Sequence, residues 1–138
     1  MEEREQTIRR WFGMWLRGRD TGIAELFTKD AVYIESWGPE YRGAEKIRLW
    51  FAEWNTRGKV LTWDIRQYFH RDNQTVAEWF FRCRMSDGTE QAFDGLSLVK
   101  WENGKIAFLQ EFGCSIGRYD PYADGPAPKF RQETAMWF

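Results

Sequence analysis

The hydrophobic residues near the start of the chain follow the spacing of a helix. Over residues 3–17, Ile8, Trp11 or Phe12, and Trp15 recur every three to four positions, and Arg and Glu fill the positions between them. Residues at this spacing lie on one face of a helix. The pattern therefore predicts an amphipathic first helix with an aromatic stripe that faces the protein core.

A second helix, a strand and a third helix are predicted from the next stretch of chain. Asp20 is a good N-cap residue for a short helix over Thr21 to Phe27. Residues 31–37 are β-branched and aromatic, which favours a strand. A helix is then expected from Gly43 to about Asn55, where the apolar residues return to helical spacing.

The rest of the ordered chain has the pattern of an antiparallel sheet. Long strand-like runs are separated by turns rich in Asn, Asp and Gly, which are residues typical of hairpins. The predicted strands cover residues 59–69, 75–85, 90–101 and 105–114. Because the helices come mainly before the strands, this order predicts an α+β fold and not alternating βαβ units.

The chain has 138 residues, which fits one domain with a core over about residues 5–115 and an irregular tail over 117–138. The tail ends in the apolar run Ala135 to Phe138, which we expect to dock on the body or on a partner chain. A net charge of −1 with scattered basic residues argues against nucleic acid and anionic membrane partners. Without a long apolar run or a signal-like start, we expect a cytoplasmic protein.

Aromatic residues make up 18% of the chain, with 9 Trp, 11 Phe and 5 Tyr. An interior this rich in aromatic groups is either fully packed or arranged as walls around a space. The two cysteines, Cys83 and Cys114, lack metal or redox spacing, and we expect both to be buried free thiols. The single histidine, His70, is expected to be exposed in a hairpin turn, so no metal or other cofactor is predicted.

The order of elements resembles that of the nuclear transport factor 2-like superfamily, and local segments are similar to its SnoaL-like domains. These segments are residues 20–32, residues 41–47, and the pair of runs 93–98 and 103–106. The resemblance implies a cone-shaped, curved antiparallel sheet wrapped around three N-terminal helices, with a pocket at its wide end. It also implies a homodimer through the outer face of the sheet. The superfamily includes isomerases, dehydratases, hydrolases, cyclases and binding proteins, so the fold leaves the function open.

Ketosteroid isomerase is a member of this superfamily whose carboxyl groups have tuned pKa values. Aligning the chain with it, allowing a one-residue deletion before Gly43, implies that Glu35 is a general base and that Asp94 is a hydrogen-bonding acid. Phe12 stands where that enzyme has a tyrosine, so half of the oxyanion site is missing. The alternative for both carboxylates is a solvated strand edge or a pairing with Arg42 or Arg82.

Strand alternation and the resemblance together identify further candidates for the pocket wall. Desolvation on an apolar wall would raise the pKa of a carboxyl group toward neutrality. The predicted binding residues are Phe12, Trp15, Tyr33, Trp37, Trp50, Phe51, Trp54, Glu78, Phe80, Leu96 and Glu111. For the tryptophans the alternative is an ordinary core position, and for Glu78 and Glu111 it is a solvated strand face.

Three functions follow from these expectations. The first is a pocket for a small apolar molecule with cofactor-free proton-transfer chemistry, such as isomerisation, dehydration or cyclisation. The second is a binder of an apolar ligand without catalysis. The third is a structural or interaction module whose core is filled by its own aromatic side chains. A cavity with inward-facing acids favours the first, and a filled core favours the third.

Overall fold

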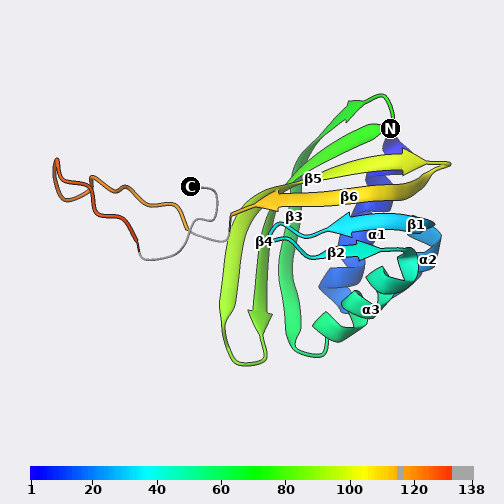
Figure 1. Ribbon diagram of the computed structural model, residues 1–138, viewed down its shortest axis with the longest axis horizontal. Helices are drawn as coiled ribbons and strands as arrows, with labels where there is room; N and C mark the ends of the chain where they lie inside the picture. The colour runs from blue at the N-terminus through cyan, green and yellow to red at the C-terminus, as the bar shows by residue number, and fades with distance from the viewer. Residues whose placement is uncertain (115–116, 132–138) are drawn as a thin grey trace.

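The computed structural model describes residues 1–114 and 117–131. Its elements alternate between helices and strands at first and then form a long meander (Figure 1). They are α1 (Glu2–Arg17), α2 (Ile23–Leu26), β1 (Phe27–Ile34), β2 (Glu40–Arg42), α3 (Ala44–Trp54), β3 (Gly58–Arg71), β4 (Gln74–Met85), β5 (Glu90–Glu102) and β6 (Lys105–Gly113). The run of residues Ala135 to Phe138, for which docking was expected, lies outside the described residues.

The strands form one curved sheet in the order β2-β1-β6-β5-β4-β3. The predicted antiparallel meander is present from β3 to β6, but β1 pairs with β6 in parallel. This part of the prediction was wrong because β1 and β6 are separated along the chain by α3 and four strands, so no hairpin joins them. The three predicted helices are present, although only α1 and α2 precede β1, while α3 follows β2. The short strand β2 carries too little pattern to be predicted.

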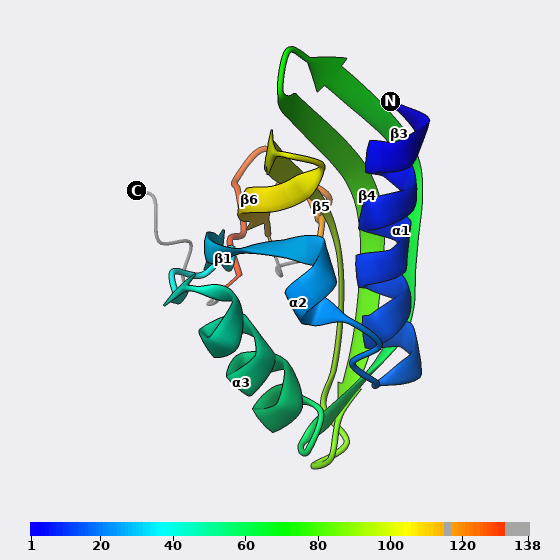
Figure 2. The same ribbon diagram turned by 90° about the vertical axis from the view of Figure 1, so that its right-hand side faces the viewer.

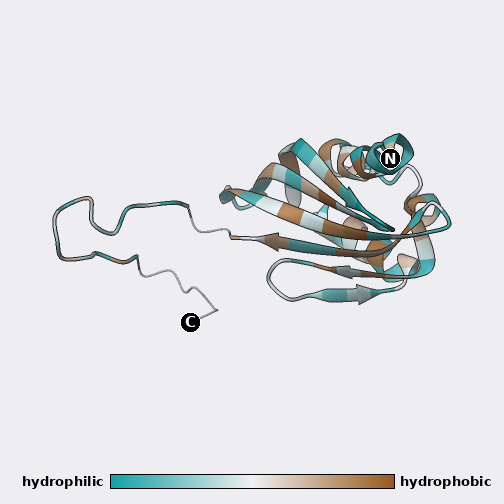
Figure 3. Cartoon of the chain, turned by 90° about the horizontal axis from the view of Figure 1, so that it is seen from above, coloured by the Kyte–Doolittle hydropathy of each residue, from teal (hydrophilic) through white to brown (hydrophobic). Residues whose placement is uncertain are grey.

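The helices lie on the inner side of the curved sheet. Figure 2 shows α1 running along β3 and β4, with α3 on the other side, below β1. At the contact between α1 and β3, the rings of Phe12 and Trp63 stack with their centroids 3.9 Å apart. Apolar and polar residues alternate along the strands, as the banded colours in Figure 3 show. The core therefore lies between the helices and the concave face of the sheet.

Outside this body, the described part of the tail, residues 117–131, contains no helix or strand and extends away from the sheet (Figure 1). Its Arg118 forms an ion pair with Asp94, with 2.6 Å between the guanidinium and carboxylate atoms. Among the described residues, no helix is both long enough and apolar enough to cross a membrane.

Candidate functional site

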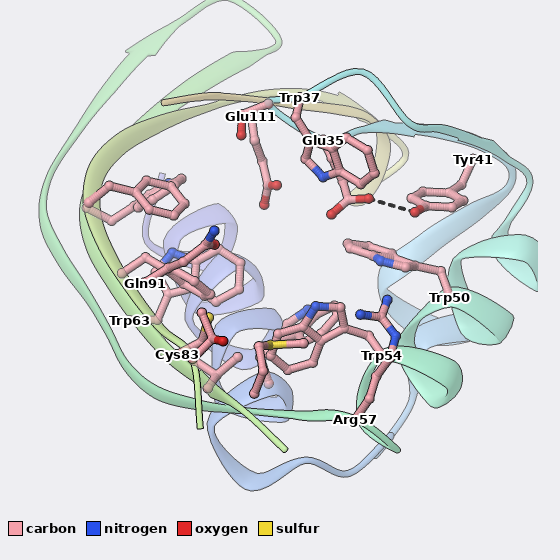
Figure 4. A pocket seen from close by; sticks show the side chains of 18 residues that line it. Glu35, Trp37, Tyr41, Trp50, Trp54, Arg57, Trp63, Cys83, Gln91 and Glu111 are labelled. Carbon is pink, nitrogen blue, oxygen red and sulfur yellow. Dashed lines mark hydrogen bonds between the residues drawn. The ribbon is translucent and has the colours of Figure 1, made fainter. Parts of the chain in front are cut away.

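A cavity of about 470 Å³ opens between the concave face of the sheet and the ends of α1 and α3. Tryptophan, tyrosine and phenylalanine side chains form most of its walls, and two carboxyl groups, those of Glu35 and Glu111, project into it (Figure 4). A cavity of this size that combines aromatic walls with a set of polar groups is typical of a small-molecule site.

Glu35 and Glu111 are neighbours because of the parallel pairing of β1 and β6. Ile34 of β1 pairs with Gln110 of β6, and Glu35 and Glu111 directly follow these two residues in the sequence. Both side chains face the interior, like Tyr33 and Leu109 two positions earlier, which are fully buried. The strand pairing therefore places two acids side by side at the edge of an aromatic core.

A chain of hydrogen bonds fixes the carboxyl group of Glu111. The indole N–H of Trp11 donates to the Tyr33 hydroxyl over 3.3 Å, and this hydroxyl donates to Oε2 of Glu111 over 2.6 Å. An indole can only donate, so the single Tyr33 proton stays free to point to Glu111, as the bond to Oε2 has it. A proton carried by Glu111 is then on Oε1, which has no hydrogen-bond partner among the described residues.

The surroundings of Glu111 favour its neutral form. Burial raises the pKa of Glu111 to about 8, the hydrogen bond from Tyr33 opposes this shift, and the negative charge of Glu35 adds to it. The same contacts, led by burial, raise the pKa of Tyr33 well above its usual value. At neutral pH, Glu111 is therefore largely protonated and can act as a hydrogen-bond donor or an acid.

More groups stabilise the negative charge of Glu35 than that of Glu111. The Tyr41 hydroxyl donates to Oε2 of Glu35 over 2.6 Å (Figure 4). Burial raises the pKa of Glu35, whereas the side chains of Tyr41 and Trp37 and the positive charge of Arg57 lower it. For Glu111, the hydrogen bond from Tyr33 lowers the pKa, but the negative charge of Glu35 raises it. Glu35 therefore ionises at a lower pH than Glu111. The pair can therefore hold one base and one acid at the same pH.

The structure separates the predicted site residues into three groups. Six lie at the cavity, namely Glu35, Glu111, Trp15, Trp37, Trp50 and Trp54. A second group, Phe12, Tyr33 and Phe51, is buried in the core behind the wall. The third group, Asp94, Glu78, Phe80 and Leu96, does not line the cavity.

Asp94 was expected to point into the cavity, but in the structure it points to the opposite face of the sheet. In β5 the inward-facing residues are Phe93, Gly95, Ser97 and Val99, so Asp94 and Leu96 point to the outer face. Asp94 there pairs with Arg66 at 2.7 Å as well as with Arg118. The side-chain hydrogen bond from Arg118 is the main reason that the pKa of Asp94 is lowered, although desolvation opposes it.

The close packing of Trp79 on Gly95 determines which residues of β5 face the interior. A Cβ atom at Gly95 would collide with Cη2 of Trp79, so only glycine fits beneath this ring. Cross-strand partners share a face, and Glu78 and Phe80 therefore lie on the outer face with Leu96 and Asp94. An isolated glycine in a strand was the sequence signal for this contact.

Sequence reasoning missed several residues of the cavity. Tyr41 and Arg57 lie in a short strand and in the turn after α3, where no periodicity predicts their direction. Trp63, Trp79 and Phe81 complete the wall from β3 and β4. Their alternation with polar residues in the predicted strands was the available signal.

Two indole groups in the wall have no acceptor. The Nε1 atoms of Trp15 and Trp63 are covered by protein and have no hydrogen-bond partner among the described residues. Because both nitrogen atoms are covered, they do not present their N–H groups to the open cavity. The carboxyl groups of Glu35 and Glu111 project into the cavity, and the polar side chains of Arg57 and Gln91 also line it (Figure 4).

His70 is not the exposed turn residue that was expected. It lies in β3 with 15% of its side chain exposed, and its Nε2 is 2.7 Å from a carboxylate oxygen of Glu5. The strand ends two residues later than predicted, at Arg71, and this extension brings His70 under α1. Its Nδ1 lies 2.9 Å from the hydroxyl of Thr75, which also accepts from Trp101. The contacts tie α1 to the sheet, away from the cavity.

The two cysteines differ in burial. Cys83 is buried and free at the cavity wall, as expected for a free thiol, but Cys114 is exposed, because it follows the last residue of β6. Within residues 1–114 and 117–131, no group of three or more His, Cys, Asp or Glu side chains is arranged to hold a metal ion.

The fold and the cavity define a protein of the nuclear transport factor 2-like class. The family model of the SnoaL-like domain matches residues 8–109, and the chain belongs to this family. No curated protein sequence matches the chain.

Solved structures with low sequence identity share the fold. A protein with a ketosteroid isomerase-like fold from Catenulispora acidiphila, solved in complex with trimethylamine, has a TM-score of 0.67 at 19% identity, over 77% of this chain and 83% of that chain. An LEH-like epoxide hydrolase from M. tuberculosis has a TM-score of 0.73 at 11% identity, over 82% and 84%. An NTF2-like protein from Burkholderia pseudomallei has a TM-score of 0.69 at 13% identity, over 83% and 93%.

Proposed function

We propose that the cavity binds a small, largely apolar molecule and carries out cofactor-free proton transfer on it. Glu35 is the base and Glu111 the acid, in reactions of the isomerase, dehydratase or cyclase type. The observation that carries this proposal is the register of β1 and β6, which brings two carboxyl groups of different environment into one aromatic cavity. Glu111 thus takes the acid role that the resemblance had assigned to Asp94.

The two roles follow from the contacts of each carboxyl group. A base must be ionised when the substrate arrives, and Tyr41 and Arg57 stabilise the charge of Glu35. An acid must hold its proton near neutral pH, and burial keeps Glu111 protonated up to about pH 8. Apolar walls strengthen both effects because they exclude water from the reacting groups.

A generic carbon acid tests this proposal without knowledge of the natural substrate. Nitrobenzisoxazole loses the proton of its ring carbon to a base, its N–O bond breaks, and a coloured nitrophenolate nitrile forms. A desolvated carboxylate in an aromatic cavity should catalyse this elimination, and absorbance follows it directly. We expect Glu35→Gln to lower the rate about 100-fold or more, which is the usual contribution of a positioned base.

Asp94→Asn is the matched control, because Asp94 is a carboxylate on the outer face of the same sheet. It should leave the elimination rate unchanged. An equal loss of rate in both variants, or full activity of Glu35→Gln, would contradict the assignment of Glu35 as the base.

Binding without catalysis is the second candidate function. The Catenulispora acidiphila protein was solved with trimethylamine, so a protein of this fold holds a small organic molecule. A binder needs the cavity but no ionised base. It would bind small apolar probes with equal affinity in the wild type and in Glu35→Gln, and it would show no elimination above that of free carboxylate in solution.

A further inference from the structure

We propose that the ligand of this cavity carries a basic nitrogen and is held as an ammonium ion, with an N–H directed at Oε1 of Glu111 and its apolar skeleton against the tryptophan rings. This inference rests on the proposed function, because it names the chemical class that the same cavity receives. It is carried by three features of the site: the aromatic walls, the charges that face the interior, and the open hydrogen-bonding position on Glu111.

The walls offer the faces that organic cations bind. Nine aromatic side chains of the described residues line the cavity, and six of them are tryptophans: Trp15, Trp37, Trp50, Trp54, Trp63 and Trp79. The face of an aromatic ring attracts a cation, most strongly when the ring is tryptophan and the cation has lost its water. Several such faces around one space, beside a carboxylate, are the usual surroundings of a bound ammonium group.

The charged groups around Glu111 leave the interior without a free cation. Glu35 faces it from the end of β1, and the neutral hydroxyls of Tyr33 and Tyr41 complete the polar groups on that side. Cys83 from β4 is a thiol whose pKa is raised by burial, so it is neutral as well. Two acids therefore face the cavity with no basic side chain between them.

Among residues 1–114 and 117–131, one basic side chain lines the cavity, and it is already paired. Arg57 lines the mouth, and its Nε lies 2.7 and 2.9 Å from the two carboxylate oxygens of Glu53. This pair is exposed, and Glu53 offsets part of the charge that Arg57 presents to a cationic ligand. The mouth is thus open to an ammonium ion, which would relieve the repulsion between the two buried acids.

A neutral carbonyl ligand finds fewer partners here. The unpaired indole N–H groups of Trp15 and Trp63 are covered by protein, and the exposed side chains of Ser36, Thr89 and Gln91 belong to the rim. Oε1 of Glu111 is an interior position with no hydrogen-bond partner among the described residues. It can donate one bond to a carbonyl, but as a carboxylate it accepts a stronger, charge-assisted bond from an ammonium N–H.

The proton balance follows from the state of Glu111. When an ammonium ion binds, the O–H bond at Oε1 breaks, the proton leaves to solvent, and the carboxylate accepts the ligand N–H. When the ligand arrives as a neutral amine, the same proton moves to its nitrogen and none is released. For a ligand that is an ammonium ion in solution, binding below about pH 8 must therefore release protons.

Three probes with one skeleton separate the ligand classes: tetralin, tetralone and aminotetralin. Isothermal titration calorimetry near neutral pH should show that the amine binds about 10- to 100-fold more tightly than the hydrocarbon, from a charged hydrogen bond and the cation–π contact. Between about pH 6 and pH 8 its affinity should rise with pH, by at most about tenfold per unit. Repeating the titration in buffers of different ionisation enthalpy measures the released protons.

Two variants locate the effect. Glu111→Gln should remove most of the preference for the amine and its pH dependence, while tetralin binding changes little. Glu78→Gln is the matched control, since Glu78 lies on the outer face and pairs with Arg66. Circular dichroism of both variants excludes loss of the fold as a cause.

The outcomes that overturn the inference are distinct from failure of the proposed function. Equal affinity for all three probes, or tightest binding of tetralone, would contradict the ammonium ligand and leave a binding cavity. Aminotetralin binding that releases no proton would also contradict it. If none of the three probes binds, both the inference and the proposed cavity function are wrong.

Discussion

The hydroxyl of Tyr33 donates to the carboxyl group of Glu111 over 2.6 Å, although the two residues are 78 positions apart in the chain. The parallel pairing of the first and last strands makes this contact. Trp11 donates to the same hydroxyl and thereby sets the direction of its proton. Burial keeps the cavity acid protonated, and a residue of α1 and a residue of β1 fix the hydrogen bond that opposes this effect.

Replacing Tyr33 by Phe should raise the pKa of Glu111 further, because the Tyr33 hydrogen bond is the contact that lowers it. The alkaline limb of the pH–rate profile for nitrobenzisoxazole should move to higher pH. The variant should also lose about 1–3 kcal/mol of unfolding free energy, since the indole N–H of Trp11 loses its buried acceptor. An unmoved alkaline limb would show that Tyr33 does not act on Glu111.

The stability of the protein should fall as pH rises from about 4.5 to about 8 because of Glu111. Its pKa in the folded state is about 8 against 4.5 as the ordinary value, so the unfolded chain releases the proton first. Glu111→Gln removes this dependence. The free energy of unfolding can be measured with urea at about pH 5 and about pH 8. Between these pH values it should fall by roughly a few kcal/mol more in the wild type than in the variant. Equal losses would mean that Glu111 titrates normally.

Gly95→Ala should destabilise the fold by about 1–3 kcal/mol, because the new methyl group collides with Trp79 and with the backbone oxygen of Phe112. Displacement of the Trp79 ring should also weaken the binding of probes in the cavity. Gly117→Ala is the control, since its Cβ would meet only Arg131 at 3.6 Å. Thermal unfolding followed by circular dichroism compares the two. No difference between them would contradict the tight packing of β5 on Trp79.

The homodimer through the outer sheet face stays a prediction, and we propose Leu96 and Phe112 as its centre. These cross-strand partners are 42% and 48% exposed on that face. Sedimentation equilibrium should show a concentration-dependent dimer for the wild type and a monomer for Leu96→Glu. A monomeric wild type, or a dimer that survives this change, would contradict the proposed interface.

The sequence predicted the fold well because hairpin turns and long alternating strands are local signals. It predicted the parallel contact of β1 with β6 poorly, since that pairing depends on residues far apart in the chain. Asp94 points outward because Gly95 packs against the ring of Trp79, and no periodicity of the sequence predicts this tertiary contact. Glu35 and Glu111 were both candidates, but only the register of β1 and β6 shows that they are neighbours.

The titration of Glu111 tests the central claim most directly. Carbon-13 spectra of glutamate carboxyl groups, compared between the wild type and Glu111→Gln, assign its resonance. We predict that this resonance titrates near pH 8 and that Glu35 titrates at lower pH. A Glu111 carboxyl group that titrates near its ordinary value of 4.5 would contradict an acid and a base held side by side in one cavity.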